Sequence, residues 1–149
     1  MTCIAWDGKE LVGDRLCTIG GTPLPPMRKV HRLVAPNGKV ALVGFSGNTA
    51  YCSSYLHWML GGEEPQLKQG EDQKWAIILI EYPRWVWYRS DTANRWDLLG
   101  ATSQWAIGSG CDYALGAMLQ GATARQAVRI ASQLDNQTGL GFNAVRFEK

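Results

Sequence analysis

Short apolar segments separated by turn residues open the chain, a pattern typical of antiparallel sheet. The strands predicted in this part span residues 2–6, 10–15, 29–33 and 40–45. Asp7-Gly8 is a signal for a type I′ hairpin turn between the first two, and Asn37-Gly38 marks a second hairpin. The glycine- and proline-rich stretch 20–26 is typical of a loop. The first third of the chain is therefore predicted to consist of hairpins.

The spacing of apolar residues changes to that of a helix after Gly47. Apolar side chains recur at positions 52, 55, 56, 59 and 60, and Gly61-Gly62 ends this predicted helix. A second helix is expected over residues 112–120. A third begins at Thr123, which has the form of a capping box with Gln126. The buried stripe expected on this third helix comprises Ala124, Ala127, Val128, Ala131 and Leu134.

Four more strands are predicted in the second half of the chain. They span residues 75–82, 85–88, 103–107 and 141–147, with a polar loop over 63–74. The segment 75–82 is almost continuously apolar, which indicates a strand covered on both faces. The order of strands, helix, strands, two helices and strand predicts an α+β layered fold with mostly antiparallel sheet. We expect one domain over residues 1–149.

Composition excludes several classes of function. The formal net charge of +2 gives no reason to expect nucleic acid or an acidic membrane surface as partner. No apolar run is long enough to span a bilayer, and the start of the chain lacks the features of a secretory signal, so a cytoplasmic location is expected. The four cysteines are scattered, without C-x-x-C or paired histidines, so neither a metal nor a cofactor is expected. The seven tryptophans favour contacts with other subunits.

The second residue of the chain is the candidate nucleophile. If Met1 is removed, Thr2 carries both a hydroxyl and a free α-amine, and such an amine can accept a proton near neutral pH. A site of this kind also needs a fixed cation, an anion that holds the cation, and backbone N–H groups for an oxyanion. Lys29, Asp14 and the glycine-rich turn ending at Gly47 are the candidates for these three parts.

The order of short motifs along the chain is that of a known family. They are T-x-I-A-x-D-G-K from Thr2, G-D at 13–14, R-K-V-x-R-L at 28–33, G-F-S-G-x-T-A at 44–50, A-I-G-S-G-x-x-Y-A-L at 106–115 and D-x-x-T-G at 135–139. In this order the chain resembles the proteasome β-subunit family of N-terminal-nucleophile hydrolases, and in size it is most similar to the bacterial HslV-type peptidases. The resemblance covers nearly the whole chain and implies a four-layer αββα sandwich.

The resemblance also implies a role for individual residues. Thr2 is the nucleophile and base, Asp14 and Lys29 are the charged groups beside it, and the N–H of Gly47 is the oxyanion donor. Three further residues are expected to support the Thr2 amine: Ser109, Asp135 and Thr138, the last replacing the serine of many proteasome subunits. Four residues are expected to bind an extended peptide or to line its first specificity pocket: Thr18, Met27, Phe45 and Thr49.

The function implied is a threonine-type endopeptidase inside a homo-oligomeric ring or double ring, acting on peptides or unfolded proteins. An ATP-dependent unfoldase is a possible partner of such a ring. Two alternatives stay open: a small-molecule amidase with the same nucleophile, and a non-catalytic ring or scaffold subunit. Residue by residue, plainer interpretations also exist, because Asp14 and Lys29 could form a surface ion pair and Asp135 could simply end its helix. His31 and His57 have no evident partner in the sequence and are interpreted as packing or surface residues.

Overall fold

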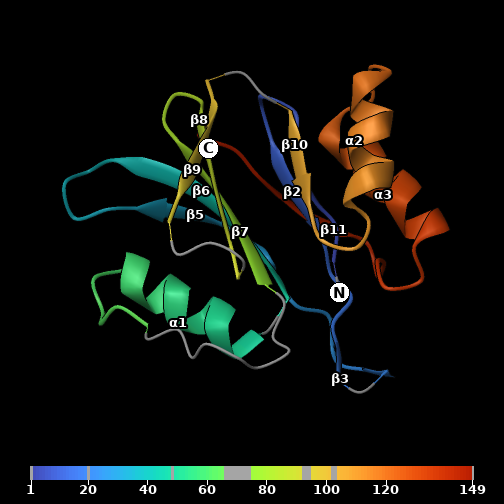
Figure 1. Ribbon diagram of the computed structural model, residues 1–149, viewed down its shortest axis with the longest axis horizontal. Coiled ribbons are helices and arrows are strands. Elements are labelled where there is room, and N and C mark those ends of the chain that lie inside the picture. Colours follow the sequence, from blue (N-terminus) through green and yellow to red (C-terminus); the bar gives the residue numbers. More distant parts are fainter. Residues whose placement is uncertain are drawn as a thin grey trace.

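Two antiparallel sheets pack face to face, and helices cover both outer faces, in a computed structural model of the chain (Figure 1). The structure describes residues 2–19, 21–47, 49–65, 75–91, 95–101 and 104–148, apart from the side chains of residues 19, 49 and 50. The layers run from helices α2 and α3, through the first sheet and the second sheet, to helix α1 (Figure 1). The predicted αββα sandwich is therefore confirmed.

The first sheet has the strand order β10-β1-β2-β11. Its strands are β1 (Ile4–Trp6), β2 (Leu11–Asp14), β10 (Trp105–Ile107) and β11 (Phe142–Val145). β1 pairs with both β2 and β10, with Ile4 opposite Gly13 and Ile107, and β2 also pairs with β11, so the first and last strands of the chain belong to one sheet. β1 and β2 consequently form the middle of this sheet.

The second sheet has the strand order β5-β6-β7-β8-β9. Its strands are β5 (Val30–Val34), β6 (Val40–Gly47), β7 (Trp75–Glu81), β8 (Trp85–Ser90) and β9 (Asp97–Gly100). As the apolar run predicted, β7 is central and has buried residues on both faces. A small third sheet pairs β3 (Thr18–Ile19) with β4 (Thr22–Pro23).

The helices are α1 (Thr49–Met59), α2 (Cys111–Leu119) and α3 (Ala124–Leu134). The capping box predicted at the start of α3 is confirmed, since Thr123 Oγ1 accepts from the N–H of Gln126 and the Gln126 side chain accepts from the N–H of Thr123. Among the described residues, no helix is long and apolar enough to cross a membrane.

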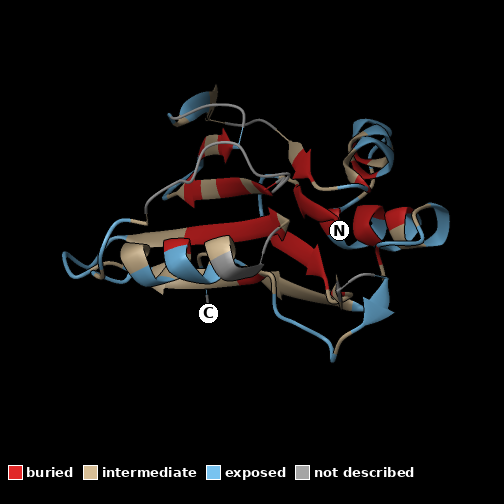
Figure 2. Ribbon diagram, turned by 60° about the horizontal axis from the view of Figure 1, so that its bottom comes forward, coloured by how far each residue is buried: buried red, intermediate tan, exposed pale blue. Residues whose placement is uncertain are grey.

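Alternation along β1 explains how one strand serves two cores. Ile4 and Trp6 point between the sheets, whereas Ala5 points toward α2 and α3. The core between the helices and the first sheet uses small residues, which lets the helices approach closely. Figure 2 shows buried residues concentrated in the two sheets and on the inner faces of the helices. On β6, a Cβ on Gly44 would lie 2.8 Å from Ile4 Cγ2, so this glycine permits the sheets to meet.

Several predictions need correction. The hairpin at Asp7-Gly8 exists, but Trp6 pairs with Leu11, so a four-residue connection replaces the two-residue type I′ turn. Leu134 and Leu60 were expected in helix cores and are exposed, because Leu134 is the last residue of α3 and Leu60 follows the end of α1. Strands β3, β4 and β9 were not predicted. Residue 103, the expected start of β10, lies outside the described residues.

Asp7 explains the longer turn and joins it to α3. Its Oδ1 accepts hydrogen bonds from the N–H groups of Lys9 and Glu10, both at 2.9 Å. Its Oδ2 accepts from the N–H of Ala124 at 2.8 Å, at the positive end of α3. One carboxylate therefore closes the first hairpin and ties it to the helix that covers its sheet.

We expect Asp7→Ala to lower the free energy of unfolding by about 1–2 kcal/mol, because three backbone donors lose their acceptor. Asp97→Ala is the matched control, since the side-chain interaction described for Asp97 is an exposed 3.6 Å pair with Arg95, and its effect should stay within about 0.5 kcal/mol. Urea unfolding measures both. Equal losses in the two variants would contradict the role given to Asp7.

Candidate active site

Asp14, at the end of β2, is a buried carboxylate with a complete set of donors. Its Oδ1 accepts from the N–H of Cys3 at 3.0 Å and from Lys29 Nζ at 2.9 Å. Its Oδ2 accepts from the N–H groups of Leu16 and Gly139, both at 3.1 Å. The carboxylate is 0% exposed, yet each of its oxygens accepts two hydrogen bonds. Asp14 therefore forms a fixed, buried anion at the end of β2.

Lys29 extends from the start of β5 to this anion and to the candidate nucleophile. Its ammonium donates to Thr2 Oγ1, to Asp14 Oδ1 and to the carbonyl of Leu16. The Lys29 side chain is 9% exposed, so its charge is shielded from bulk water. The arrangement places one positive charge directly on the hydroxyl of Thr2. The interpretation of Asp14 and Lys29 as a mere surface ion pair is wrong for this chain, because both side chains are buried.

A second network contacts the other end of Thr2. The N–H of Thr2 donates to Ser109 Oγ at 3.2 Å. Ser109 Oγ donates to Asp135 Oδ2 at 2.5 Å, and Thr138 Oγ1 donates to the same oxygen at 2.7 Å. Burial raises the pKa of Asp135, but these two hydrogen bonds and one from the N–H of Gln137 outweigh it and hold the pKa below its ordinary value. Asp135 is therefore a carboxylate at neutral pH and accepts hydrogen bonds from the hydroxyls of Ser109 and Thr138.

The Gly108-Ser109-Gly110 turn shapes this network. Gly108 has a φ of +97°, and a Cβ there would lie 2.0 Å from the carbonyl oxygen of Thr2. The N–H of Gly110 donates to that same oxygen at 3.2 Å. Only a glycine at position 108 lets the turn approach Thr2 closely enough for Ser109 to reach it.

The strand-to-helix junction that carries Gly47 adjoins the same place. Gly47 ends β6 with a φ of +102° and pairs with Trp75, and α1 begins two residues later. Ser46 Oγ is 3.2 Å from the position of the Cβ that Gly108 lacks, which puts the end of β6 beside Thr2. The oxyanion role of the Gly47 N–H stays a prediction.

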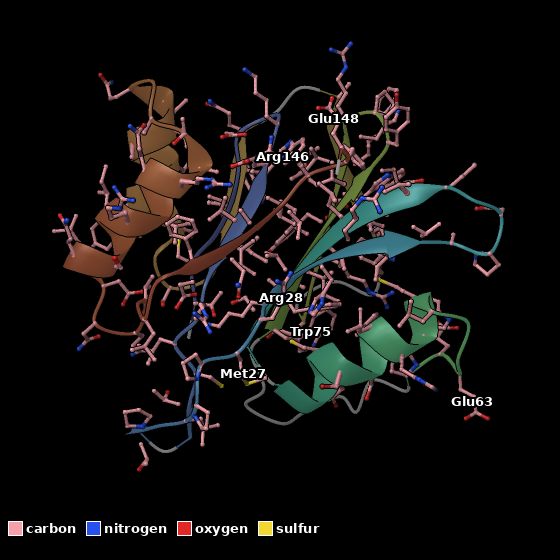
Figure 3. The ribbon with its side chains drawn as sticks, turned by 180° about the vertical axis from the view of Figure 1, so that it is seen from behind. Met27, Arg28, Glu63, Trp75, Arg146 and Glu148 are labelled. Carbon is pink, nitrogen blue, oxygen red and sulfur yellow. The ribbon has the colours of Figure 1, made fainter. Side chains whose placement is uncertain are left out.

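The residues expected to contact substrate come from four different parts of the chain. Thr18 is the first residue of β3 and directly follows the buried Cys17. Phe45 on β6 is 5% exposed, whereas Met27, before β5, is 36% exposed. Met27 and Arg28 lie at the same end of the sandwich as Trp75, near α1 (Figure 3). Thr49 is the first residue of α1, and its side chain lies outside the described part.

Sequence reasoning missed several groups of the site. These are the amides of Cys3, Leu16 and Gly139, the carbonyl of Leu16, and the space beside Gly108. Backbone groups carry no side-chain signature, so only the glycines at 108 and 139 could have indicated them. Among the described residues, no group of three or more His, Cys, Asp or Glu is placed to hold a metal ion.

Comparisons with known proteins agree with this architecture. No family model and no curated protein matches the chain. Solved structures do: eukaryotic HslV from Trypanosoma brucei has a TM-score of 0.64 at 18% identity, over 97% of both chains. Thiobacillus denitrificans BPH in complex with epoxomicin has 0.68 at 17%, over 97% of this chain and 96% of that one. The Anbu complex from Pseudomonas aeruginosa, a helical assembly, has 0.72 at 11%, over 99% and 81%.

These likenesses show the fold. The chain is a structural match to HslV-type and Anbu proteins over nearly its full length, and it has the N-terminal-nucleophile hydrolase fold that the sequence resemblance implied.

Proposed function

We propose that this chain is a threonine-type peptidase subunit in which Thr2, after loss of Met1, attacks peptide bonds. The observation that carries the proposal is the Lys29 ammonium, which contacts both Thr2 Oγ1 and the buried Asp14 carboxylate. A buried cation held against a hydroxyl stabilises negative charge that develops on that oxygen. A purely structural threonine would need no such neighbour.

The proposed reaction uses both ends of Thr2. The α-amine, held by Ser109, accepts the proton of Oγ as Oγ bonds to the peptide carbonyl carbon. The N–H of Gly47 stabilises the oxyanion. The C–N bond then breaks, the amine passes its proton to the leaving nitrogen, and an ester remains on Oγ. Water, activated by the same amine, hydrolyses that ester and restores Thr2.

The two charged networks keep the Thr2 amine neutral and correctly oriented. The Lys29 ammonium contacts the hydroxyl of Thr2, close to the amine of that residue. A second positive charge beside it is disfavoured, so Lys29 favours the neutral form of the amine. The hydroxyl of Ser109 is held by Asp135 and accepts one N–H of the amine, which fixes the direction of its lone pair. Asp135 and Thr138 thus act as positioning residues, because they act through Ser109.

We further propose that the subunits assemble into a closed homo-oligomer that secludes the site. The Pseudomonas aeruginosa structural neighbour forms a helical assembly, which supports association of copies with one another and not the closure of a ring. Large apolar side chains are exposed on the outer side of α2 and α3 here, namely Tyr113, Leu119, Ile130 and Leu134. Such a surface supports contact with further copies of the chain. Light scattering after gel filtration tests this proposal, and a strictly monomeric protein would contradict it.

Labelling with a threonine-directed epoxyketone or boronate, followed by intact-mass and peptide mass analysis, tests the catalytic proposal. The expected result is a chain lacking Met1 with one adduct on Thr2. A protein that keeps Met1 throughout has no free Thr2 amine and would be a non-catalytic subunit. A labelled protein that hydrolyses small amides and spares peptides and casein would instead be an amidase.

Gly108→Ala should disturb the site more than the strain of a positive φ alone would do, because its Cβ would also collide with Thr2. Gly121 has nearly the same φ, +99°, but a Cβ there would meet nothing within 4 Å, so Gly121→Ala is the matched control. The control should lose about 1 kcal/mol of stability from its backbone conformation. Gly108→Ala should lose more and should also lose Thr2 labelling, because its Cβ displaces the Thr2 carbonyl. Equal labelling of the two variants would contradict the argument.

A further inference from the structure

Arg89 lies on the face of β8 that is turned toward α1. Its partner across the sheet is Ile77, which belongs to the core between the second sheet and α1. Arg89 is 8% exposed, and its Nε is buried without a hydrogen-bond partner among the described residues. A guanidinium keeps its charge at physiological pH. The second sheet therefore carries a buried cation whose inner N–H has no acceptor.

Exposed arginines of this chain are better paired than this buried one. The side chains of Arg95, Arg125 and Arg146 are 85%, 45% and 54% exposed, and each forms an ion pair with a carboxylate. No ion pair or hydrogen bond is described for the Arg89 side chain within residues 2–148. A buried charge needs a partner far more than an exposed charge does. The unpaired state of Arg89 thus indicates that a group is missing from its surroundings.

Two aromatic rings face the Arg89 guanidinium. Its Cζ lies over the ring of Tyr55 on α1, 5.4 Å from the centroid, and over the ring of Trp96 at 6.0 Å. Tyr55 also contacts Trp75, whose ring lies at the end of the sandwich near α1 (Figure 3). Ring faces attract a cation, but they accept N–H groups only weakly. The N–H groups along the edge of the guanidinium still lack a strong acceptor.

A second donor on this face of β8 is in the same state. Trp87 is two residues from Arg89, and its strand partner Leu79 packs on the same core, so both side chains are on the α1 side. Trp87 Nε1 is buried without a partner. Trp6 and Trp105 share that property, but their rings make T-shaped contacts with other rings between the sheets. For Trp87 the described part of the chain supplies no such contact.

The acidic side chains nearest to this place do not neutralise Arg89. Glu64, after the end of α1, influences the Tyr55 phenol electrostatically but is itself exposed. Asp97, at the start of β9, pairs with Arg95. Burial raises the pKa of Tyr55 more than Arg89 lowers it, so the phenol is neutral at pH 7. The described side chains around Arg89 therefore leave one positive charge that is not balanced.

We propose that Arg89 and Trp87 form a binding site for the carboxylate of a small apolar organic anion, on the α1 side of the second sheet. The edge of a guanidinium presents two parallel N–H groups that match the two oxygens of a carboxylate. The Trp87 N–H is a further donor for one of these oxygens. The neighbouring rings favour an apolar or aromatic body on the ligand, and a single guanidinium balances a single negative charge.

The ligand approaches from the outer edge of the guanidinium. Only Nε of Arg89 is among the buried nitrogen atoms without a partner, so the two Nη atoms reach solvent. Trp96 is half-buried and precedes the edge strand β9, where a turn of its ring opens the way to Nε. The proposal does not rest on the peptidase function, because no group of the Thr2 network takes part in it.

Isothermal titration of the folded protein at pH 7.5 with benzoate, benzamide and inorganic phosphate tests the site. Benzoate and benzamide are similar in size and differ in charge. We expect benzoate to saturate one site per chain with a Kd of about 5 mM or below, and benzamide and phosphate to bind about tenfold more weakly or less. In a spectrum of nitrogen-15-labelled indoles, benzoate should shift the Nε1–H signal of Trp87 and leave that of Trp105 in place.

Arg89→Gln should weaken benzoate binding by about tenfold or more, because the charge and the fork are both lost. Arg129→Gln is the matched control, since Arg129 is an exposed arginine on α3, and it should bind as the parent does. If Arg89→Gln folds poorly, Arg89→Lys keeps the charge and loses the fork, and should weaken binding by about threefold or more.

The role of the indole N–H has its own pair of variants. Trp87→Phe keeps an aromatic ring and removes the donor, so it should weaken benzoate binding several-fold and also assign the Trp87 signal. Trp105→Phe makes the same change between the sheets and should leave the affinity unchanged.

Four results would overturn the inference. They are no saturable benzoate binding up to about 50 mM, equal binding of benzoate and benzamide, unchanged affinity in both Arg89 variants, and an Arg89-dependent preference for phosphate. The first three remove the site, and the fourth removes the assignment to carboxylates. Thr2 labelling is measured separately, so failure of this site would leave the peptidase proposal as it stands.

Discussion

Thr2→Ala should abolish both covalent labelling and peptide hydrolysis, with a loss on the order of 10⁴-fold or more. The substitution removes the oxygen that forms the ester, and no other hydroxyl contacts the Lys29 ammonium among the hydrogen bonds described for it. The fold should survive, because Lys29 keeps Asp14 and the Leu16 carbonyl as partners. Labelling by mass analysis, kcat/KM on a fluorogenic peptide, and the oligomeric state measure the three expectations.

Thr2→Ser is the control for this experiment. It retains the hydroxyl and, after Met1 removal, the amine, so labelling should persist at a reduced rate. Unchanged hydrolysis by Thr2→Ala in a preparation shown by mass to carry the substitution would remove Thr2 from the mechanism. Loss of activity in both variants together with loss of assembly would instead indicate a structural role for this buried residue.

Lys29→Met should lower kcat/KM by roughly 10²–10³-fold, because it keeps the aliphatic stem and removes the charge that stabilises the Thr2 oxygen. It also leaves the buried Asp14 carboxylate without its cation, which costs about 3–5 kcal/mol of stability in comparable pairs. Activity must therefore be compared with the folded fraction, which circular dichroism and urea unfolding provide.

The double variant Lys29→Met with Asp14→Asn separates the two effects. Removing both charges should recover part of the lost stability and none of the activity, since the cation is still absent. Recovery of activity along with stability would contradict a catalytic role for Lys29 and would assign it to folding alone.

The sequence predicted those features that depend on neighbouring residues, and it failed for those that depend on residues far apart in the chain. The capping box at Thr123 and the central strand β7 follow from local patterns, and both are confirmed. The turn at Asp7-Gly8 did not follow, because the Asp7 carboxylate is used by α3, more than a hundred residues away. Tertiary contacts overrode a local preference.

The same distinction holds for the site. Local reasoning supplied Thr2 as a candidate, but its contact with Ser109 joins residues 107 positions apart, and only the resemblance to a known family suggested it. Strands β3 and β4 were missed because they are two residues long and rich in glycine and proline around them. Strands this short are formed by pairing with each other, and two residues are too few to show an alternation of apolar and polar positions.

The four donors around Asp14 have a consequence for the order of events during synthesis. Two of them come from Cys3 and Leu16, near the start of the chain, but one comes from Gly139, ten residues before its end. Ser109 and its partner Asp135 add the same requirement from another side. A chain in which Gly139 has not yet been synthesised therefore cannot complete the network around Asp14, and one that lacks Asp135 cannot complete the network around Ser109. Under the proposed peptidase function, Thr2 would gain its full set of partners only after the segment 135–139 has folded against the first sheet.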